Sequence, residues 1–201
     1  MVSFEGKTIA PGDRKYRDLT GEGVVNSNDR TAIGDTNPLF NFGINNEFRI
    51  GNLDVGVFID GSYGGKILNA FRRQLEPSLD NNINNLSTEA WAGRWTPENG
   101  SNVYARLLNQ TDQQVSTYYV EDGSYLRIKN LNIGYTFGQK YFGRSGISKL
   151  RVYLLIDNVY TFTKYSGLDP EVRSYEKFLR ALDQTSYPRT RNYMAGVNIT
   201  F

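Results

Sequence analysis

The chain has 201 residues and contains no cysteine and no histidine. Without cysteine it has no disulfide framework and no thiolate zinc site. Without histidine it lacks the commonest metal ligand and the commonest general base near neutral pH, so triads that use either residue are excluded. The chain also lacks the run of about 18 apolar residues that a membrane-spanning helix needs. Its mean hydropathy of -0.51 agrees with that absence.

The chain also has little net charge, +2 from 23 basic and 21 acidic residues. No basic stripe follows the chain, so the charge does not indicate a nucleic-acid partner. The first residues, MVSFEGK, contain no apolar segment of the kind that a signal peptide carries. A protein that is exported to a membrane would need such a segment. If the chain belongs to one, as the strands described below indicate, we expect it to be one end of a longer protein.

The chain is rich in glycine, tyrosine and phenylalanine, with 20, 14 and 11 residues. Its last ten residues alternate in character. One side of an extended segment would carry Tyr193, Ala195, Val197, Ile199 and Phe201, and the other side Met194, Gly196, Asn198 and Thr200. A strand crosses a bilayer in about 9–11 tilted residues, with an apolar outer face and a more polar lumen face. The segment therefore predicts a membrane β-strand.

Four further segments alternate in the same way. They are 40–50 and 53–60, joined by a turn at Gly51-Asn52, and then 125–137 and 149–159. The residues 1–37, 66–120 and 160–190 read as long polar loops, with short helices predicted at 67–75 and 87–91. The link at 138–148 is short.

Short turns that alternate with long loops are typical of outer-membrane barrels, whose long loops face outward. The sequence thus predicts an all-β chain of antiparallel hairpins, forming the last strands of a transmembrane β-barrel with long outer loops. Only about five strands can be counted, whereas the smallest bacterial barrels have 8. We expect residues 1–201 to be the C-terminal portion of such a barrel.

The segment DLTGEGVVNSND at 18–29 is similar to a calcium loop of the EF-hand type. Gly23 stands at position six, where the sharp turn requires glycine. Calcium prefers oxygen ligands, and this spacing would wrap them around one point. The predicted ligands are Asp18, Thr20, Glu22, the carbonyl of Val24, Asn26 and Asp29. The alternative is a turn rich in hydrogen-bonding side chains that holds no ion.

Charged residues on the predicted strands allow two interpretations. Carboxylates and basic partners could form a glycosidase-like acid–base pair, or they could line a barrel lumen and pair across strands, which we favour. The residues are Asp54, Asp60, Arg127, Lys129, Arg151 and Asp157. Three tyrosines could contact a ligand or form part of an aromatic girdle at the membrane interface, and we favour the girdle. They are Tyr118, Tyr119 and Tyr125.

Five motifs in a fixed order extend over almost the whole chain. They are PGDRKYRDLTGEGVVNSNDRTAIGDTNPLFNFGIN (11–45), RWTPENGSN (94–102), YVEDGSYLRIKNLNIGYTF (119–137), DNVYTFTKYSGLDPEV (157–172) and SYPRTRNYMAGVNITF (186–201). With these motifs the chain resembles the C-terminal part of SusC-like TonB-dependent outer-membrane transporters. The family more often has DLNGDG where this chain has DLTGEG. No part of the plug domain, the TonB box or the first strands is recognised.

This resemblance implies an import function and no catalysis. Transporters of this family are 22-stranded outer-membrane barrels with an internal plug, which TonB energises from the inner membrane. A SusD-like surface lipoprotein caps the barrel and helps to capture an oligosaccharide or peptide. The terminal strand also resembles the signal that the barrel-assembly machinery recognises, with Gly196, Ile199 and Phe201 at the expected spacing.

Two other classes of protein remain open at this point. One is a secreted, calcium-stabilised β-domain that binds carbohydrate, which would need a second apolar layer. The other is a carboxylate-based hydrolase, which would need an acid–base pair.

Overall fold

A computed structural model describes residues 3–76, 85–107, 114–172 and 180–201 of the chain. The chain divides into two compact units, each assembled from three segments. Unit 1 comprises 1–35, 67–121 and 172–185, and unit 2 comprises 36–66, 122–171 and 186–201.

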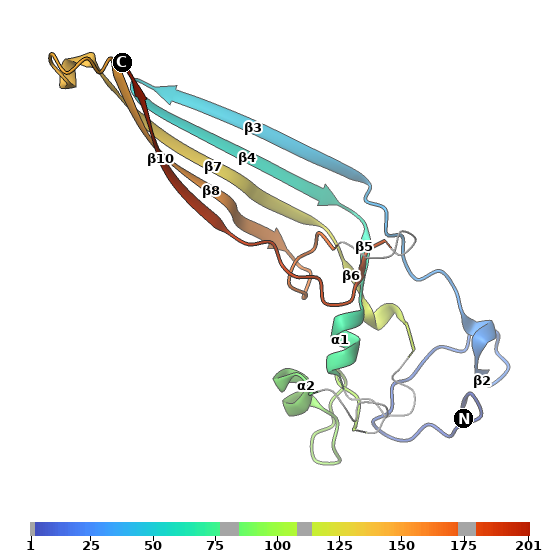
Figure 1. Ribbon diagram of the computed structural model, residues 1–201. Coiled ribbons are helices and arrows are strands. Elements are labelled where there is room, and N and C mark those ends of the chain that lie inside the picture. Colours follow the sequence, from blue (N-terminus) through green and yellow to red (C-terminus); the bar gives the residue numbers. More distant parts are fainter. Residues whose placement is uncertain (1–2, 77–84, 108–113, 173–179) are drawn as a thin grey trace. The chain divides into compact units, whose positions relative to one another are not determined.

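Unit 2 is built on an antiparallel sheet of five strands. Its strands are β3 (Phe40–Ile50), β4 (Leu53–Tyr63), β7 (Tyr125–Gly138), β8 (Lys149–Thr163) and β10 (Asn192–Thr200). They lie side by side in the order β10-β8-β7-β4-β3 (Figure 1). Each strand therefore pairs with the strand of the same sheet that precedes it in the sequence. The all-β fold of antiparallel hairpins is confirmed, and the described strands do not close into a barrel.

The short connections lie at one end of this sheet. Gly51 has a φ of +61°, which suits the first position of a tight hairpin turn. The link between β7 and β8 contains η3 (Gln139–Tyr141), and Phe201 follows β10 at the same end. Because successive strands are antiparallel, the long connections emerge at the opposite end. The predicted alternation of short and long connections is thus present.

One face of the sheet is apolar. The register places Val55 opposite Ile133, and Ile133 opposite Leu154. None of the apolar side chains on this face is buried; Val197 is 56% exposed. The face comprises Ile44, Phe48, Leu53, Val55, Val57, Ile59, Leu131, Ile133, Leu150, Val152, Leu154, Ile156, Ala195, Val197 and Ile199. A surface in contact with lipid requires this exposure, whereas a sandwich core would bury these side chains.

Aromatic side chains border the apolar face at both ends. Phe40 stacks on Tyr63, and Tyr160 meets Phe162, at the end with the long connections. At the short-turn end Phe137 contacts Tyr135 and Tyr141. About ten residues of β8 separate the two borders, or about 25 Å at a strand tilt of roughly 40°. This spacing matches an apolar band between two aromatic girdles.

A β-bulge at Lys129 keeps the charged residues of β7 on one face. The apolar positions of this strand have odd numbers from Leu131 onward, but even numbers at Leu126 and Ile128. Lys129 is the extra residue between the pairs Phe58–Asn130 and Ile59–Ile128. Since one inserted residue reverses the alternation of side chains, the bulge leaves Arg127 on the polar face.

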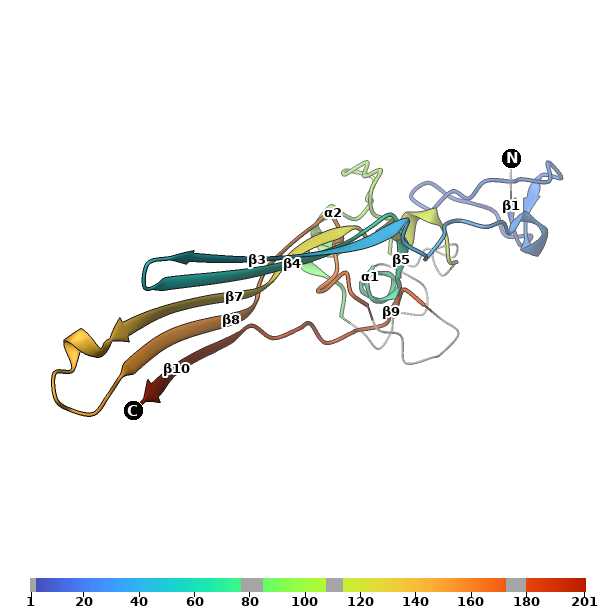
Figure 2. The same ribbon diagram turned by 90° about the horizontal axis from the view of Figure 1, so that it is seen from above.

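Unit 1 has little regular structure. Its short strands are β1 (Ser3–Phe4), β2 (Val24–Val25), β5 (Lys66–Asn69), β6 (Val120–Asp122) and β9 (Leu182–Asp183), two of which extend into unit 2 by a residue. Its helices are η1 (Ser27–Asp29), α1 (Ala70–Leu75), α2 (Thr88–Gly93) and η2 (Thr117–Tyr119). Figure 2 shows α1 along its axis, next to β5 and β9. No helix of the described residues is long and apolar enough to cross a membrane.

Several predicted boundaries need correction. The helix predicted at 67–75 begins only at Ala70, because Ile67 and Leu68 belong to β5 and Asn69 caps the helix by accepting from the Arg72 N–H. The helix predicted at 87–91 is α2, which Ser87 caps. The strand predicted to end at Val159 continues to Thr163. Parts of the predicted long loops, 77–84, 108–113 and 173–179, lie outside the described residues.

The apolar face predicts which of two neighbouring substitutions the membrane tolerates. Ile44 and Asn45 are adjacent on β3, are both exposed, and lie on opposite faces. Ile44→Arg places a charge on the lipid side and is expected to cost about 2–4 kcal/mol, whereas Asn45→Arg places it on the polar side. Heat-dependent gel migration of outer-membrane fractions measures the folded protein. We expect less folded protein for Ile44→Arg and an unchanged amount for Asn45→Arg. An equal loss of folded protein in both variants would contradict the lipid-facing position of Ile44.

Candidate functional site

The polar face carries an ion pair that spans three strands. Arg151 on β8 reaches across β7 to Asp54 on β4, and its Nε donates to Asp54 Oδ1 over 3.0 Å. The Arg151 guanidinium crosses the backbone at Gly134, where any Cβ would collide with it. Glycine at this position therefore makes the cross-strand contact sterically possible.

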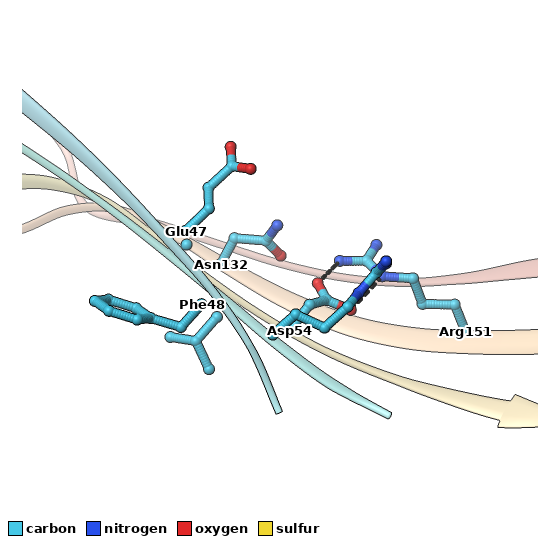
Figure 3. A pocket seen from close by; sticks show the side chains of 8 residues that line it. Glu47, Phe48, Asp54, Asn132 and Arg151 are labelled. Carbon is cyan, nitrogen blue, oxygen red and sulfur yellow. Dashed lines mark hydrogen bonds and ion pairs between the residues drawn. The ribbon is translucent and has the colours of Figure 1, made fainter. Parts of the chain in front are cut away.

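A shallow polar cavity of about 510 Å³ lies beside this ion pair. Glu47, Asn132, Asp54 and Arg151 contribute to its lining. Figure 3 shows Glu47 and Asn132 projecting on one side of the sheet, while Phe48 points to the other side. Asn132 Oδ1 is buried and accepts no hydrogen bond within the described part of the chain. Carboxylate and amide oxygens thus contribute to the wall of this cavity.

Of the other predicted charges, Lys129 and Asp60 pair across strands, whereas Asp157 accepts from a neutral side chain. Lys129 Nζ lies 2.6 Å from Asp60 Oδ2, and Asn130 Nδ2 donates to Asp157 Oδ1 over 2.7 Å. Asp54 and Asp60 are six residues apart on one strand, or about 20 Å, too far for a retaining carboxylate pair at about 5–5.5 Å. The predicted cross-strand ion pairing is confirmed for Asp54 with Arg151 and for Asp60 with Lys129.

A buried ion cluster lies near the long-connection end of the polar face. Arg127, only 1% exposed, contacts Asp169 Oδ1 at 2.6 Å and Glu171 Oε2 at 3.0 Å. Its Nε donates to Thr161 on β8, and Arg189 makes a second ion pair with Glu171. Asp169 and Glu171 precede the undescribed residues 173–179, and Arg189 follows them. The cluster therefore attaches both arms of the β8–β10 connection to β7.

The sequence pointed to Arg127 but not to the other three charged residues of its cluster. Asp169 and Glu171 lie in the motif ending LDPEV, and Arg189 lies in SYPRTRN. The available signal was an acidic pair and a basic residue on either side of one long connection. Nothing in their spacing indicates that they gather around Arg127, which lies about 40 residues or more earlier in the sequence.

In unit 1 a buried carboxylate organises three segments. Glu76, 1% exposed, pairs with Arg14 at 3.2 Å and Arg72 at 2.8 Å, and accepts from the Tyr118 hydroxyl over 3.1 Å. The Arg14 guanidinium lies 3.5 Å from the centroid of the Tyr118 ring, and that of Arg72 lies 4.4 Å away. Burial raises the pKa of Glu76, although Arg72 and Arg14 oppose the shift. Burial likewise raises the pKa of Tyr118.

The predicted girdle position of the three tyrosines is wrong. Tyr118 belongs to the Glu76 cluster, and Tyr119 is fully buried beside it, with ring centroids 4.9 Å apart. Tyr125 lies on the polar face, since it alternates with Ile128 and Leu126 and its ring is 5.3 Å from the Arg127 guanidinium. The girdle instead uses aromatic residues from the apolar face of the strands.

The loop at 18–29 folds around two aspartates. Asp18 accepts from the N–H groups of Gly21 and Gly23 over 2.6 and 2.8 Å. Asp29 accepts from Leu19, Thr20 and Asn26 over 2.7, 3.1 and 2.8 Å. The N–H groups of Asn26 and Thr20 hold the pKa of the Asp29 carboxyl below its usual range. Backbone donors thus stabilise the charged form of the Asp29 carboxylate.

The predicted calcium ligands are only partly brought together. Thr20 Oγ1 lies 3.3 Å from Asp18 Oδ1 and 3.2 Å from Asp29 Oδ1 and can donate to either. Glu22 instead accepts from the Asn26 side chain, whose Oδ1 accepts from Asn28. Val24 belongs to β2. Among the described residues, no group of three or more acidic side chains is arranged to hold a metal. Calcium binding stays a prediction.

The terminal strand positions the three residues of the predicted assembly signal. Gly196 lies opposite Tyr153, whose ring occupies the space where a Cβ would be. Ile199 is exposed on the apolar face, and Phe201 is 84% exposed. The structure thus gives Gly196 a packing role, and it leaves Ile199 and Phe201 accessible.

Over nearly its whole length the chain is similar to one part of the TonB-dependent receptors of the outer membrane. The TonB-dependent receptor P3 of Formosa agariphila is 35% identical over 199 residues, which cover 95% of this chain and 19% of the receptor. The TonB-dependent receptor SusC of Bacteroides thetaiotaomicron is 24% identical over 196 residues, 95% of this chain and 18% of SusC. No protein-family model matches.

Solved structures agree with these relatives. The RagAB peptide importer in its open-open state superimposes with a TM-score of 0.69 and 27% identity, covering 83% of this chain and 17% of that one. Its closed-closed state gives a TM-score of 0.65 and 25% identity, covering 83% and 18%. The resemblance to SusC-like receptors and the outer-membrane location predicted from the motifs are confirmed. The chain spans about a fifth of the length of the curated relatives that it matches.

The ion cluster predicts that one buried charge holds the β8–β10 connection. Arg127→Met removes the cation and leaves Asp169 buried without it, a change that typically costs about 3–5 kcal/mol. We expect faster proteolysis at residues 164–171 and a lower melting temperature. Arg49→Met, an exposed residue on the same face, is the matched control. Unchanged proteolysis in Arg127→Met would contradict the role of the cluster.

Proposed function

We propose that the chain forms the final strands and outer loops of an active importer in the outer membrane. In this proposal a SusD-like lipoprotein captures the nutrient at the cell surface, and TonB supplies energy through a plug domain elsewhere in the receptor. The observation that carries the proposal is the match of 94–100% of this chain to TonB-dependent receptors.

The two faces of the sheet support this proposal independently of the relatives. The exposed apolar face with its aromatic borders suits lipid. The opposite face carries paired charges and a shallow polar cavity, as expected for a barrel wall that surrounds a hydrated passage or a plug. Two open edges, on β3 and β10, are where further strands would pair, because unpaired backbone groups are not tolerated in hydrocarbon.

The transported nutrient would be an oligosaccharide or a peptide. One structural relative is described as a peptide importer, and SusC is a relative in sequence. Both observations support uptake of an oligomeric nutrient by the complete receptor.

Uptake in a deletion strain tests the function. Cells that lack the receptor should fail to accumulate a labelled peptide or oligosaccharide that parental cells take up, and a plasmid copy should restore uptake. Loss of TonB should abolish the same uptake, because the receptor would remain assembled without its energy source. Affinity purification of the receptor should recover a SusD-like lipoprotein. Uptake that persists without the receptor in every nutrient tested would overturn the proposal.

We further propose that the loop at 18–29 holds a structural calcium ion through Asp18, Thr20 and Asp29. The two carboxylates converge on one hydroxyl, and no basic side chain of the described residues pairs with either. Calcium titration by calorimetry should give a dissociation constant of about 10⁻⁴ to 10⁻³ M, typical of extracellular modules. Asp18→Asn should weaken binding, whereas Glu98→Gln, an exposed acid elsewhere in unit 1, should not. Equal affinity in both variants would exclude this loop.

We also propose that Phe201, with Gly196 and Ile199, forms the signal for the barrel-assembly machinery. The exposed edge of β10 can pair with the machinery by strand addition before the barrel closes. Deletion of Phe201 from the complete receptor should lower the amount assembled in the outer membrane far more than the amount synthesised, as pulse-labelling with membrane fractionation measures. Normal assembly of the deletion would make Phe201 a girdle residue only.

A further inference from the structure

Unit 1 contains a cavity of about 850 Å³ beside the loop at 18–29. Phe4, Tyr16, Leu19, Val25, Ile33 and Val115 form its apolar walls. Phe4 and Val25 are buried, and the rings of Phe4 and Tyr16 lie 5.4 Å apart, so this part of the wall is firmly packed. Leu19 and Val115 remain about half exposed, at 46% and 50%. The volume lies in the range of small-ligand sites.

Three arginines line the same cavity. Arg17, Arg30 and Arg73 have no side-chain hydrogen bond or ion pair among the described residues. Two acids, Glu5 and Asp29, also contribute to the lining, but the Asp29 carboxylate already accepts the N–H groups of its own loop. Within the described part of the chain the three guanidiniums therefore have unused donors, and a guanidinium binds a carboxylate through two parallel hydrogen bonds.

A buried hydroxyl gives a second, independent indication of a ligand. Ser116 Oγ is shielded from solvent, and no described residue forms a hydrogen bond with it. Ser116 lines both this cavity and a second one of about 580 Å³. Tyr16, Arg17 and Thr117 are shared in the same way, so the two cavities adjoin along these residues. A buried polar atom without a partner costs free energy, which a ligand that bonds to it would recover.

We propose that these adjoining cavities bind a peptide that carries an aliphatic side chain and a carboxylate. The aliphatic side chain occupies the walls formed by Leu19, Val25 and Val115. The carboxylate pairs with Arg30 and Arg73, and a main-chain amide bonds to Ser116 Oγ. The inference deepens the proposed import function and depends on it for its biological meaning.

The chemistry of the walls favours a peptide over an oligosaccharide. Sugars stack on open aromatic faces, but in the larger cavity the rings of Phe4 and Tyr16 pack on each other, with centroids 5.4 Å apart, and the other apolar walls are aliphatic. In the smaller cavity the ring of Tyr118 is already covered by the guanidiniums of Arg14 and Arg72. The side of Trp95 next to Gly12 is likewise occupied, since a Cβ on that glycine would meet the indole.

Binding to the purified complete receptor tests this site. The probes are the dye-labelled peptide Leu-Val-Glu, the same peptide with its carboxyl groups converted to amides, and neutral maltohexaose. We expect the acidic peptide to bind at least about tenfold more tightly than the amidated one, because a charged hydrogen bond is lost. Arg30→Gln and Arg73→Gln should each raise its dissociation constant by about tenfold. The control Arg144→Gln, an exposed arginine in the link between β7 and β8, should leave it unchanged.

A second variant tests the apolar walls without altering charge. Val115→Trp, at an exposed position, should fill the cavity and weaken the binding of the peptide without affecting the assembly of the receptor. Equal binding by the acidic and amidated peptides, tighter binding of maltohexaose, or indifference to Arg30→Gln and Arg73→Gln would each overturn the site. Uptake by the deletion strain distinguishes a wrong peptide site from a wrong import function. If the receptor restores uptake but the peptide does not bind these cavities, import stands and the nutrient binds elsewhere in the receptor.

Discussion

A sheet that contacts hydrocarbon on one side must collect all its charged groups on the other. Every strand of unit 2 follows this requirement through the two-residue alternation of side chains. The constraint explains why Arg151 crosses β7 to reach Asp54 and why Lys129 pairs with Asp60. It also explains the bulge, because without it Arg127 would lie on the lipid side of β7. The ion cluster that attaches the β8–β10 connection thus depends on a single inserted residue.

The strands could be predicted because their signal is local. Alternation and the Gly51 turn located the β3–β4 hairpin and the starts of β7, β8 and β10 to within a residue or two. The end of β8 was missed, because the apolar pattern at Tyr160 and Phe162 resumes after Asn158, which has a φ of +53°. No local pattern indicates that a residue with such a backbone will remain within a strand.

The interactions that organise the loops could not be predicted, because they join residues far apart in the sequence. Glu76 combines with Arg14 and Tyr118, 62 and 42 residues away.

The calcium motif illustrates the opposite difficulty. Its spacing located a real folded loop, and Asp18, Thr20 and Asp29 do converge there, yet Glu22 pairs with Asn26 instead. Local spacing specified the turn, whereas the choice of partner for each side chain depended on three-dimensional contacts.

The glycines of the polar face set the width of the passage that a closed barrel would enclose. The Arg151 guanidinium lies over Gly134 and the Tyr153 ring over Gly196. Two large side chains therefore lie flat against the backbone of the sheet. A Cβ at either glycine would lie closer than van der Waals contact to the nearest atom of the side chain above it, so that side chain would have to move away from the backbone. The polar side of the sheet would then extend further from the backbone, although none of its polar side chains had changed. Positions without a side chain can therefore limit the size of what passes through.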